Sequence, residues 1–536
     1  MVICLSVSMM GQAKMEFVKE AFGNEDYEAV VQQATELLKS QPKNVGALYY
    51  RSFAFYALGK VPQSLDDAGN AIKFWNKKCG YTIGELYYYR AQIYDAINDS
   101  VAAVSDFNTA VKKDKKNIEC YIKRGNFYYD HQNIAAAEAD FRTAHGMDKS
   151  NPEPQVELAR CMLMQDKDAE ASAVLDRVLL YEPQNIDAKR LRAYVYYRAD
   201  EYKPFIDSYI SYLDLNHRGN LDMLMYAASQ EYAYCLKMVS AKVNTASDDG
   251  DRFFWLGVRS RVYQVKEQYD DALEDLDRMS EIVPDTVFNG FIAYQRANCY
   301  EGLYNYGKTA EILSELIARE RAEGYGIDRS LFTRGFCYAN MGEYGKAIVD
   351  FNEVINNKGD WAVLAYCQRG QCRYEMGAGA ELAIEDFSKG LLLEEDNLSC
   401  LIMRGKLRLL ELHDTIGAYQ DFERILEIDT TLYGYTCRQY ALMYMGRFDE
   451  AIEWMDKLLD ADPSRGNYYD AACLYARMNR PDEAVQYFKT SLEKGYRAFY
   501  HIEIDDDLDS LRERDDFKEV LEKYRQKKVL DLFNKL

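Results

Sequence analysis

The feature that most constrains the fold is a pattern of small and aromatic residues that recurs after 34 positions. One set, spaced by four and then three residues within each half, comprises Tyr121, Gly125, Tyr128, Ala137, Phe141 and Ala144. The same offsets occur 34 positions earlier, at Tyr87, Ala91, Tyr94, Ala103, Phe107 and Ala110. Spacings of three and four place side chains on one face of an α-helix. The repeating unit is therefore predicted to be a pair of helices.

Small residues explain how the two helices of a unit can pack closely. They recur in the middle of the first helix, at Gly125, Ala159, Gly335, Gly370 and Gly405. Alanine recurs early in the second helix, at Ala103, Ala137, Ala171, Ala272, Ala347 and Ala451. One hairpin cannot bury its apolar faces alone, so neighbouring units must stack. The residue types and the period resemble the tetratricopeptide repeat, which implies an all-α solenoid, a right-handed superhelix of about fourteen helical hairpins.

The helix breakers agree with this division and suggest an organisation for the whole chain. All nine prolines fall near predicted helix boundaries, where a missing N–H is tolerated. Residues 14–242 are predicted to form an N-terminal array and residues 253–496 a C-terminal array. The stretch 243–252 is predicted to be a loop and a soft boundary. Residues 497–536 resemble the closing segment of bacterial tetratricopeptide proteins and are predicted to cap the last hairpin.

A second regularity involves arginine and aspartate. They stand sixteen residues apart in Arg51–Asp67, Arg90–Asp106, Arg124–Asp140, Arg259–Asp275 and Arg334–Asp350, and seventeen apart in Arg369–Asp386 and Arg404–Asp421. When the hairpin folds about its turn, the arginine of the first helix and the aspartate of the second helix come to lie side by side. The spacing predicts a recurrent ion pair, either between paired helices or across to the adjoining unit, with unrelated solvated charges as the alternative.

Charge and composition exclude several classes of partner. The formal net charge is −21, and nucleic acids and anionic lipids are bound mainly through Lys and Arg, so both are unexpected as partners. No apolar run approaches the roughly 18 residues that span a bilayer, so no integral membrane segment is expected. The twelve cysteines show no CxxC pair or zinc spacing. Four of them, Cys161, Cys299, Cys337 and Cys372, share one repeat position and are expected to act as small hydrophobic residues.

The sequence contains no recognisable catalytic or cofactor signature. It has no glycine-rich phosphate loop, no GxSxG and no HExxH motif. The five histidines are scattered among different units, and the acidic clusters lack the calcium-loop pattern. We therefore expect a protein that is not an enzyme and that has no catalytic residues, cofactor or metal.

The tetratricopeptide resemblance implies that a protein or peptide partner binds in the concave groove lined by the first helices. A carboxylate clamp of the family is not expected, because Ile122, Glu157, Asp187 and Leu191 replace four of its five polar positions and only Asn126 remains. Aromatic residues are predicted to grip an extended or helical segment, since tyrosine offers a large area with a polar tip. The groove residues predicted from the repeat frame are Tyr49, Phe53, Tyr56, Tyr88, Tyr129, Arg190, Tyr194, Tyr197, Phe291, Tyr294, Phe332 and Phe336.

The predicted function is that of a non-catalytic interaction scaffold or adaptor. The alternative is an envelope or carbohydrate-binding accessory protein of an exported complex. This alternative follows from residues 1–13, a short apolar stretch whose end resembles a signal-peptide cleavage site. An exported, periplasmic location is accordingly expected, with a cytoplasmic location as the alternative.

Overall fold

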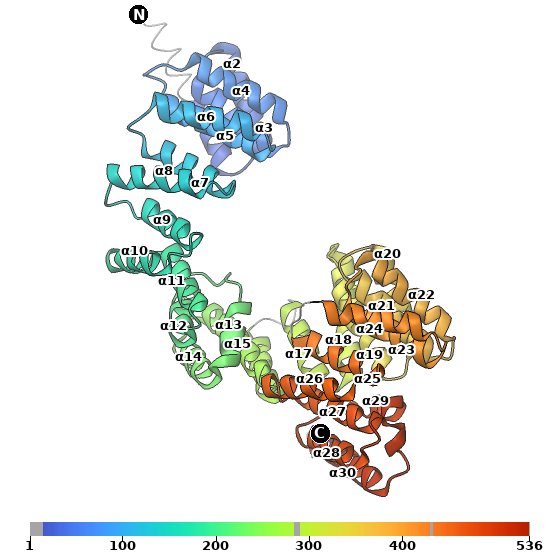
Figure 1. The fold of residues 1–536 in the computed structure, drawn as a ribbon. Coiled ribbons are helices and arrows are strands. Elements are labelled where there is room, and N and C mark those ends of the chain that lie inside the picture. The colour runs from blue at the N-terminus through green and yellow to red at the C-terminus, as the bar shows by residue number, and fades with distance from the viewer. Residues whose placement is uncertain (1–13, 283–289, 429–431, 535–536) are drawn as a thin grey trace, which may run out of the picture. The chain divides into compact units, whose positions relative to one another are not determined.

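The computed structural model describes residues 14–282, 290–428 and 432–534, and within these ranges it contains helices and loops but no strand. Contacts divide the chain into two compact units, Met1–Met238 and Val239–Leu536. In both, each helix packs mainly on its neighbours in the sequence, so the hairpins stack in order (Figure 1). The predicted all-α solenoid of paired helices is confirmed.

The first unit begins with a helix that includes residues 14–23. Its other helices are α2 (Tyr27–Ser40), α3 (Val45–Ala57), α4 (Val61–Phe74), α5 (Ile83–Ala96), α6 (Ser100–Lys113), α7 (Ile118–Asp130), α8 (Ile134–Met147), α9 (Glu153–Leu163), α10 (Asp168–Tyr181), α11 (Ile186–Arg198), α12 (Tyr202–Leu213) and α13 (Asp222–Gln230). Helix α14 (Tyr232–Thr245) crosses the boundary between the units.

The second unit continues the same pairing. Its helices are α15 (Asp249–Val265), α16 (Tyr269–Ile282), α17 (Gly290–Gly302), α18 (Tyr306–Glu323), α19 (Asp328–Asn340), α20 (Tyr344–Asn357), α21 (Ala362–Glu375), α22 (Ala380–Leu393), α23 (Leu398–Leu410), α24 (Thr415–Glu427), α25 (Leu432–Tyr444), α26 (Phe448–Ala461), α27 (Arg465–Arg477) and α28 (Pro481–Glu493). The chain then ends in α29 (Phe499–Ile504), the 3₁₀ helix η1 (Asp506–Leu511) and α30 (Asp515–Asn534). We call α3, α5 and the further odd-numbered helices to α27 the first helices, and their even-numbered partners the second helices.

Local sequence sets where these helices begin and end. Asparagine side chains cap α3, α7, α11 and α23 by accepting a hydrogen bond from a backbone N–H of the first turn, and each such cap contributes about 1 kcal/mol. In every described hairpin from α3–α4 to α27–α28 except α13–α14, the turn between the paired helices contains a residue with positive φ, a conformation that glycine adopts without strain. Glycine takes this place where it is predicted, at Gly59, Gly342, Gly377 and Gly446, with φ between 71° and 76°.

The predicted small residues allow the paired helices to approach each other. A Cβ atom added to Gly125 would lie 2.6 Å from the Phe141 ring. The equivalent distance is 2.5 Å between Gly405 and Phe422. Both phenylalanines come from the second helix and are fully buried. The core therefore consists of a buried aromatic ring seated on a small residue, repeated along the array.

All seven predicted Arg–Asp ion pairs are present, with closest N···O distances of 2.6–2.7 Å. Each joins the first and second helices of one hairpin, and the aspartates are buried. The remaining nitrogen of several arginines donates a hydrogen bond to the second helix of the preceding hairpin. These bonds are Arg51 to Thr35, Arg124 to Asn108, Arg334 to Ser314, Arg369 to Asn352 and Arg404 to Ser388.

The prediction of a loop over residues 243–252 is wrong for most of its length. Helix α14 continues to Thr245 and α15 begins at Asp249. The Asp248 side chain accepts a hydrogen bond from the backbone N–H of Asp251, so the acidic stretch caps a helix instead of extending a loop. The polar residues that suggested a loop end α14, precede α15 or form its first turn.

The predictions for the cysteines hold in the described ranges. Cys161, Cys299, Cys337 and Cys372 are free and buried, as expected for small hydrophobic residues. Burial raises the pKa of the Cys161 thiol to about 12, so it stays protonated. Among the described helices, none combines the length and the apolar character needed to cross a membrane.

Candidate functional site: the first-helix faces

The last part of the second unit folds back across the first helices of the same unit. We call residues 496–511 the C-terminal segment. Its Tyr496 ring lies 5.8 Å from the Tyr304 ring, and its Tyr500 hydroxyl lies 3.0 Å from the Tyr344 hydroxyl. Tyr500 also packs on Gly342, where an added Cβ would come within 2.7 Å of its hydroxyl oxygen. The C-terminal segment therefore packs against the turns that follow the first helices α17 and α19 and against the start of α20.

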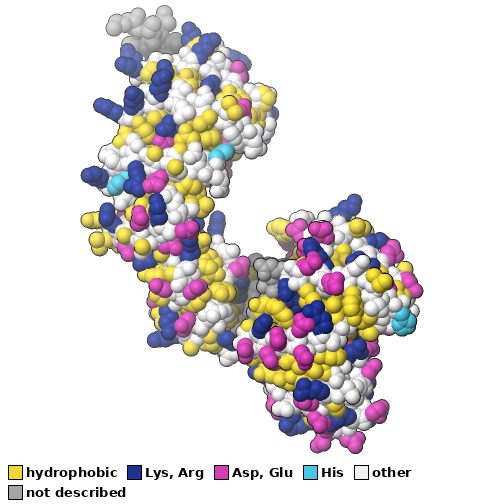
Figure 2. Space-filling model, in the orientation of Figure 1, with side chains coloured by type: hydrophobic (Ala, Val, Ile, Leu, Met, Phe, Trp, Pro, Cys, Tyr) yellow, Lys and Arg dark blue, Asp and Glu magenta, His cyan; other side chains and the backbone are white. Residues whose placement is uncertain are grey.

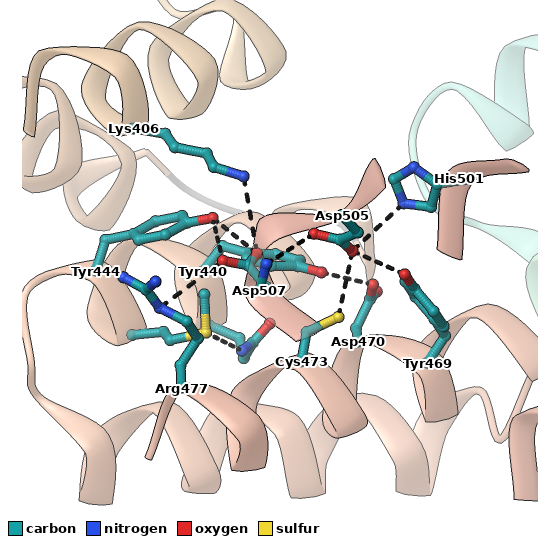
Figure 3. A network of polar contacts seen from close by, with 12 residues as sticks. Lys406, Tyr440, Tyr444, Tyr469, Asp470, Cys473, Arg477, His501, Asp505 and Asp507 are labelled. Atoms are coloured by element: carbon teal, nitrogen blue, oxygen red, sulfur yellow. Dashed lines mark hydrogen bonds and ion pairs between the residues drawn. The ribbon is translucent and has the colours of Figure 1, made fainter. Parts of the chain in front are cut away.

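A buried polar network holds the C-terminal segment in place (Figure 3). The Tyr444 hydroxyl of α25 donates to Asp507 Oδ2 at 2.9 Å, and the Tyr469 hydroxyl of α27 donates to Asp505 Oδ2 at 2.8 Å. Lys406 Nζ of α23 lies 3.9 Å from Asp507 Oδ2. Three first helices thus contact two carboxylates of the C-terminal segment.

Further groups complete this network. Arg477 Nε lies 3.8 Å from Asp507 Oδ1, and His501 Nε2 lies 3.6 Å from Asp505 Oδ2. The Cys473 thiol contacts the same Asp505 oxygen at 3.6 Å. Nearby, the Tyr440 hydroxyl donates to Asp470 Oδ1 at 2.8 Å (Figure 3). The network is satisfied on most sides, as a buried ionic cluster must be.

The protonation of the network follows from burial and from the neighbouring charges. Burial raises the pKa of Asp507 and raises that of Asp470 to about 7. Burial acts in the same direction on Asp505, but His501 and Lys406 outweigh it and lower its pKa. Burial disfavours the charged form of Lys406, yet the surrounding aspartates outweigh it and raise the pKa of this ammonium group. Lys406 therefore stays charged as the counterion of the C-terminal segment.

The network has the character of a structural anchor. Burial, together with Asp505, Asp507 and Asp470, raises the pKa of the Cys473 thiol well above its usual range, so this group is a poor nucleophile. In the described ranges, no group of three or more His, Cys, Asp or Glu side chains is placed to hold a metal ion. The arrangement can fix a segment of chain, and a cavity remains beside it.

This cavity has a volume of about 300 Å³. It lies between the C-terminal segment and the first helices α19 and α21, next to the turn that follows α17. Its walls include the rings of Phe336, Tyr344 and Tyr500 and the polar side chains of Gln371 and Glu375. The cavity is of the size that binds small organic groups.

The first unit presents a different face. A cluster of four tyrosines, called here the tyrosine cluster, is formed by Tyr194 and Tyr197 of α11, Tyr202 of α12 and Tyr226 of α13. The Tyr226 ring lies 5.9 Å from both the Tyr197 and the Tyr202 rings. Tyr194 is 41% exposed and Tyr226 is 50% exposed. The helices of residues 14–238 pack mainly on their sequence neighbours.

The charged side chains are mixed with hydrophobic ones over the visible surface. In Figure 2, Lys and Arg are more frequent over the N-terminal helices, whereas Asp and Glu gather at the C-terminal end of the second unit. The net charge of −21 is therefore distributed unevenly.

The structure places the groove residues predicted in the first unit in two environments. Some lie mainly in the interior. Tyr49 contacts the rings of Tyr50, Tyr81 and Tyr89 at 4.8–5.6 Å, and burial raises its pKa. Phe53 packs on Phe22 at 4.9 Å, and Tyr88 is half-buried beside Phe107 and Phe127. These three side chains offer little area to a partner.

Others are more accessible. Tyr56 is 37% exposed, Arg190 pairs with Asp187 at 3.1 Å on the surface, and Tyr194 and Tyr197 belong to the tyrosine cluster. The half-buried Tyr129 lies under the Arg160 guanidinium, 4.2 Å from its ring centroid. Of the residues predicted here, the structure brings together Tyr194 and Tyr197.

The predicted residues of the second unit do not form one surface. Phe291 is 40% exposed, Tyr294 lies under the Arg329 guanidinium at 4.2 Å, and Phe332 packs on Phe351 and Trp361. Phe336 lines the cavity.

The prediction missed the polar residues of the cavity and of the network. A signal for them exists in the repeat frame. Phe336, Gln371, Lys406, Tyr440 and Cys473 occupy one repeat position, directly after the small residue or its equivalent in the first helix. Phe336 and Gln371 line the cavity, and Lys406 and Cys473 contact the C-terminal segment. Tyr440 bonds to Asp470 of α27. Because the prediction took only aromatic residues at this position, it missed the polar ones.

Stacked helical hairpins, several of them with a buried ring seated on a small residue, define a helical-repeat solenoid protein. Models of the tetratricopeptide repeat match residues 128–194, 328–360, 440–465 and 466–493, in both units. The chain therefore contains tetratricopeptide repeats in both units.

Comparison with known proteins adds similarities of limited extent. A chloroplastic protein of Arabidopsis thaliana is 29% identical over 83 residues, which cover 15% of this chain and 25% of that protein. Yeast Tom70 is 13% identical, with 91% of this chain and 97% of that chain covered and a TM-score of 0.39. The C-terminal part of a tetratricopeptide repeat-containing protein from Cytophaga hutchinsonii is 14% identical, with 49% and 99% covered and a TM-score of 0.34.

Proposed function

We propose that this protein is a non-catalytic interaction scaffold that holds an extended segment of a partner protein on the first-helix face of its first unit. The tetratricopeptide matches support a role in binding protein or peptide partners. We choose the first-helix face of the first unit because it contains the tyrosine cluster. Tyr194 is 41% exposed, and Tyr226 is 50% exposed although it contacts the rings of Tyr197 and Tyr202.

Exposed tyrosines suit a binding face for a physical reason. Each ring offers a large, rigid area, and its hydroxyl supplies a hydrogen bond at small entropic cost. The first-helix face of the second unit is already partly covered by the C-terminal segment, which reduces the area left for a partner there. A segment with apolar side chains, flanked by polar groups that reach Asp187 and Arg190, is the partner that this surface fits.

A paired substitution tests the proposal. Tyr194→Ala with Tyr226→Ala should reduce capture of the partner at least tenfold while helicity and the urea midpoint stay close to wild type. The matched control is Tyr181→Ala, because Tyr181 is 79% exposed but lies on the second helix α10. A photo-crosslinking residue placed at position 194 should capture a partner in cells, and one at position 181 should not. Equal capture from both positions would reject this face.

Export also remains a proposal. Residues 1–13, on which the expectation of a signal peptide depends, lie outside the described residues. Expression of the full chain in a bacterium, followed by fractionation and N-terminal sequencing, would decide it. A periplasmic product that begins near Lys14 supports export, and a cytoplasmic product that keeps residues 1–13 rejects it.

A further inference from the structure

The cavity beside the C-terminal segment is lined largely by aromatic side chains that contact one another. Six aromatic side chains line it: Tyr304, Tyr306, Phe336, Tyr344, Tyr496 and Tyr500. The hydroxyls of Tyr344 and Tyr500 are hydrogen-bonded at 3.0 Å, and the Tyr304 ring contacts the Tyr306 and Tyr496 rings at 6.1 and 5.8 Å. The rings therefore hold one another in position and leave the cavity pre-formed.

One polar stripe crosses this aromatic lining. Gln368, Gln371 and Glu375 of α21 follow one another at spacings of three and four, so they lie on one helix face. All three line the cavity and are half-buried. Within the described ranges none of them makes a side-chain hydrogen bond or an ion pair, whereas the neighbouring Asn340 is bonded to a backbone carbonyl. Polar groups left open in this way are available to a ligand.

The charged groups around the cavity favour a ligand with a positive charge. Glu375 has no positive partner within ion-pair distance in the described ranges. Lys406 is the basic group that acts on it, and this ammonium already faces Asp507 at 3.9 Å. Asp505 and Asp506 both repel the carboxylate, and burial together with this repulsion raises the pKa of Glu375. The His501 ring, which also lines the cavity, is engaged by Asp505 at 3.6 Å. A bound cation would supply the missing positive charge.

We propose that this cavity binds an organic cation, an ammonium or guanidinium group carried on a short aliphatic stem. The cation would face Glu375 and donate hydrogen bonds to the side-chain oxygens of Gln368 and Gln371. The stem would pack against the tyrosine rings, and these rings add cation–π attraction to the charge. A free alkylamine and a lysine or arginine side chain of a partner both carry this chemistry. The site lies in the second unit and is independent of the tyrosine cluster.

The test is calorimetric titration of the full chain. The probes for a free ligand are cadaverine and n-butylguanidinium, and the probes for a protein source are the blocked tripeptides acetyl-Gly-Lys-Gly-amide and acetyl-Gly-Arg-Gly-amide. The neutral isostere n-butylurea controls for shape, and methyl glucoside tests for a sugar site. We expect saturable binding of the cations and at least tenfold weaker binding of n-butylurea. Binding of the amines alone identifies a free ligand, and binding of the tripeptides identifies a partner side chain.

Two variants connect the binding to the carboxylate. Glu375→Gln should weaken cation binding at least tenfold, whereas Glu381→Gln should leave it unchanged. Glu381 is the matched control because it lies exposed in the first turn of α22 and loses the same charge. Helicity and the urea midpoint show whether each variant is folded, and Glu375→Gln is expected to be as stable as wild type since it removes a charge that burial disfavours. No saturable binding of any cation, equal binding of n-butylurea, binding of methyl glucoside alone, or unchanged binding by a folded Glu375→Gln would overturn the proposal.

Discussion

The Arg259–Asp275 pair permits a quantitative test of the ion pairs that repeat along the array. Arg259 Nε donates to Asp275 Oδ2 at 2.7 Å, and Nη2 donates to Oδ1 at 2.6 Å. The arginine side chain is 10% exposed and the aspartate side chain 2% exposed, which makes this one of the most buried pairs of the seven. Asp275→Ala removes both charge-assisted bonds and leaves the guanidinium buried without its anion. We expect a loss of about 3–5 kcal/mol in the free energy of unfolding.

The double variant Arg259→Met with Asp275→Leu separates the pair from the burial of its members. It replaces the two charges by apolar groups of similar size, so it should stay within about 1–2 kcal/mol of wild type. Glu315→Gln serves as the control, because Glu315 pairs with Arg319 at 3.0 Å while 64% exposed. An exposed pair of this kind contributes about 0.3–0.5 kcal/mol.

The assay is urea unfolding of the full chain followed by circular dichroism. Because a long repeat array does not have to unfold in one step, hydrogen exchange of the α15 and α16 amides is measured in parallel. The reasoning is refuted if Asp275→Ala costs no more than Glu315→Gln. The reasoning is also refuted if the double variant loses as much free energy of unfolding as Arg259→Met and Asp275→Leu lose when their separate losses are added.

Two further predictions concern the packing and the buried network. Gly405→Ala should destabilise the chain by about 1–3 kcal/mol, because the new Cβ would lie 2.5 Å from the Phe422 ring. Gly345→Ala, which has no atom within 4 Å, should not, and urea midpoints compare the two. The pKa of Asp470 is about 7 when folded, above its value of about 3.9 when unfolded. Its stabilising effect is thus complete at low pH and lost as the pH rises toward 7. Relative to wild type, Asp470→Asn should therefore gain about 2–3 kcal/mol between pH 5 and pH 8, and equal midpoint differences at the two pH values would contradict this.

The fold is predictable because its determinants are local and repeated. The distance in sequence from Arg124 to Asp140 equals the length of chain that leads around one hairpin, so the ion pair follows from the spacing alone. The positions of Gly125 and Phe141 follow in the same way, because a helix crossing demands a small residue opposite a large one. Each repetition of the pattern tests the same physical rule again.

The binding faces are less predictable because they depend on contacts between distant residues. Phe53 and Tyr194 occupy the same repeat position, each directly after the small residue of its helix. Phe53 is covered by Phe22 and by Tyr89, whereas no ring of the following hairpin covers Tyr194 to the same extent. Both residues are aromatic and occupy the same repeat position. Their exposure differs because the residues that surround them differ.

The C-terminal segment shows the same limit more strongly. Tyr500 meets Tyr344 across 156 positions of sequence, and Asp507 meets Tyr444 across 63. No periodicity encodes such a contact, since it depends on how far the array curves before it ends. The closing segment is therefore predictable as a cap on α27 and α28, where Leu508, Leu511 and Phe517 join the core, but its path over the first helices is not.

The arginine that reaches back to the preceding hairpin has a consequence for how the array comes apart. When one hairpin melts, Arg369 or Arg404 of the next hairpin loses an acceptor and becomes harder to keep buried. Unfolding of one repeat thereby destabilises the next repeat. The stability of the array then depends on coupling between nearest-neighbour repeats. Unfolding of a hairpin on the N-terminal side of such an arginine hydrogen bond costs additional free energy. Long blocks of hairpins are therefore expected to melt together.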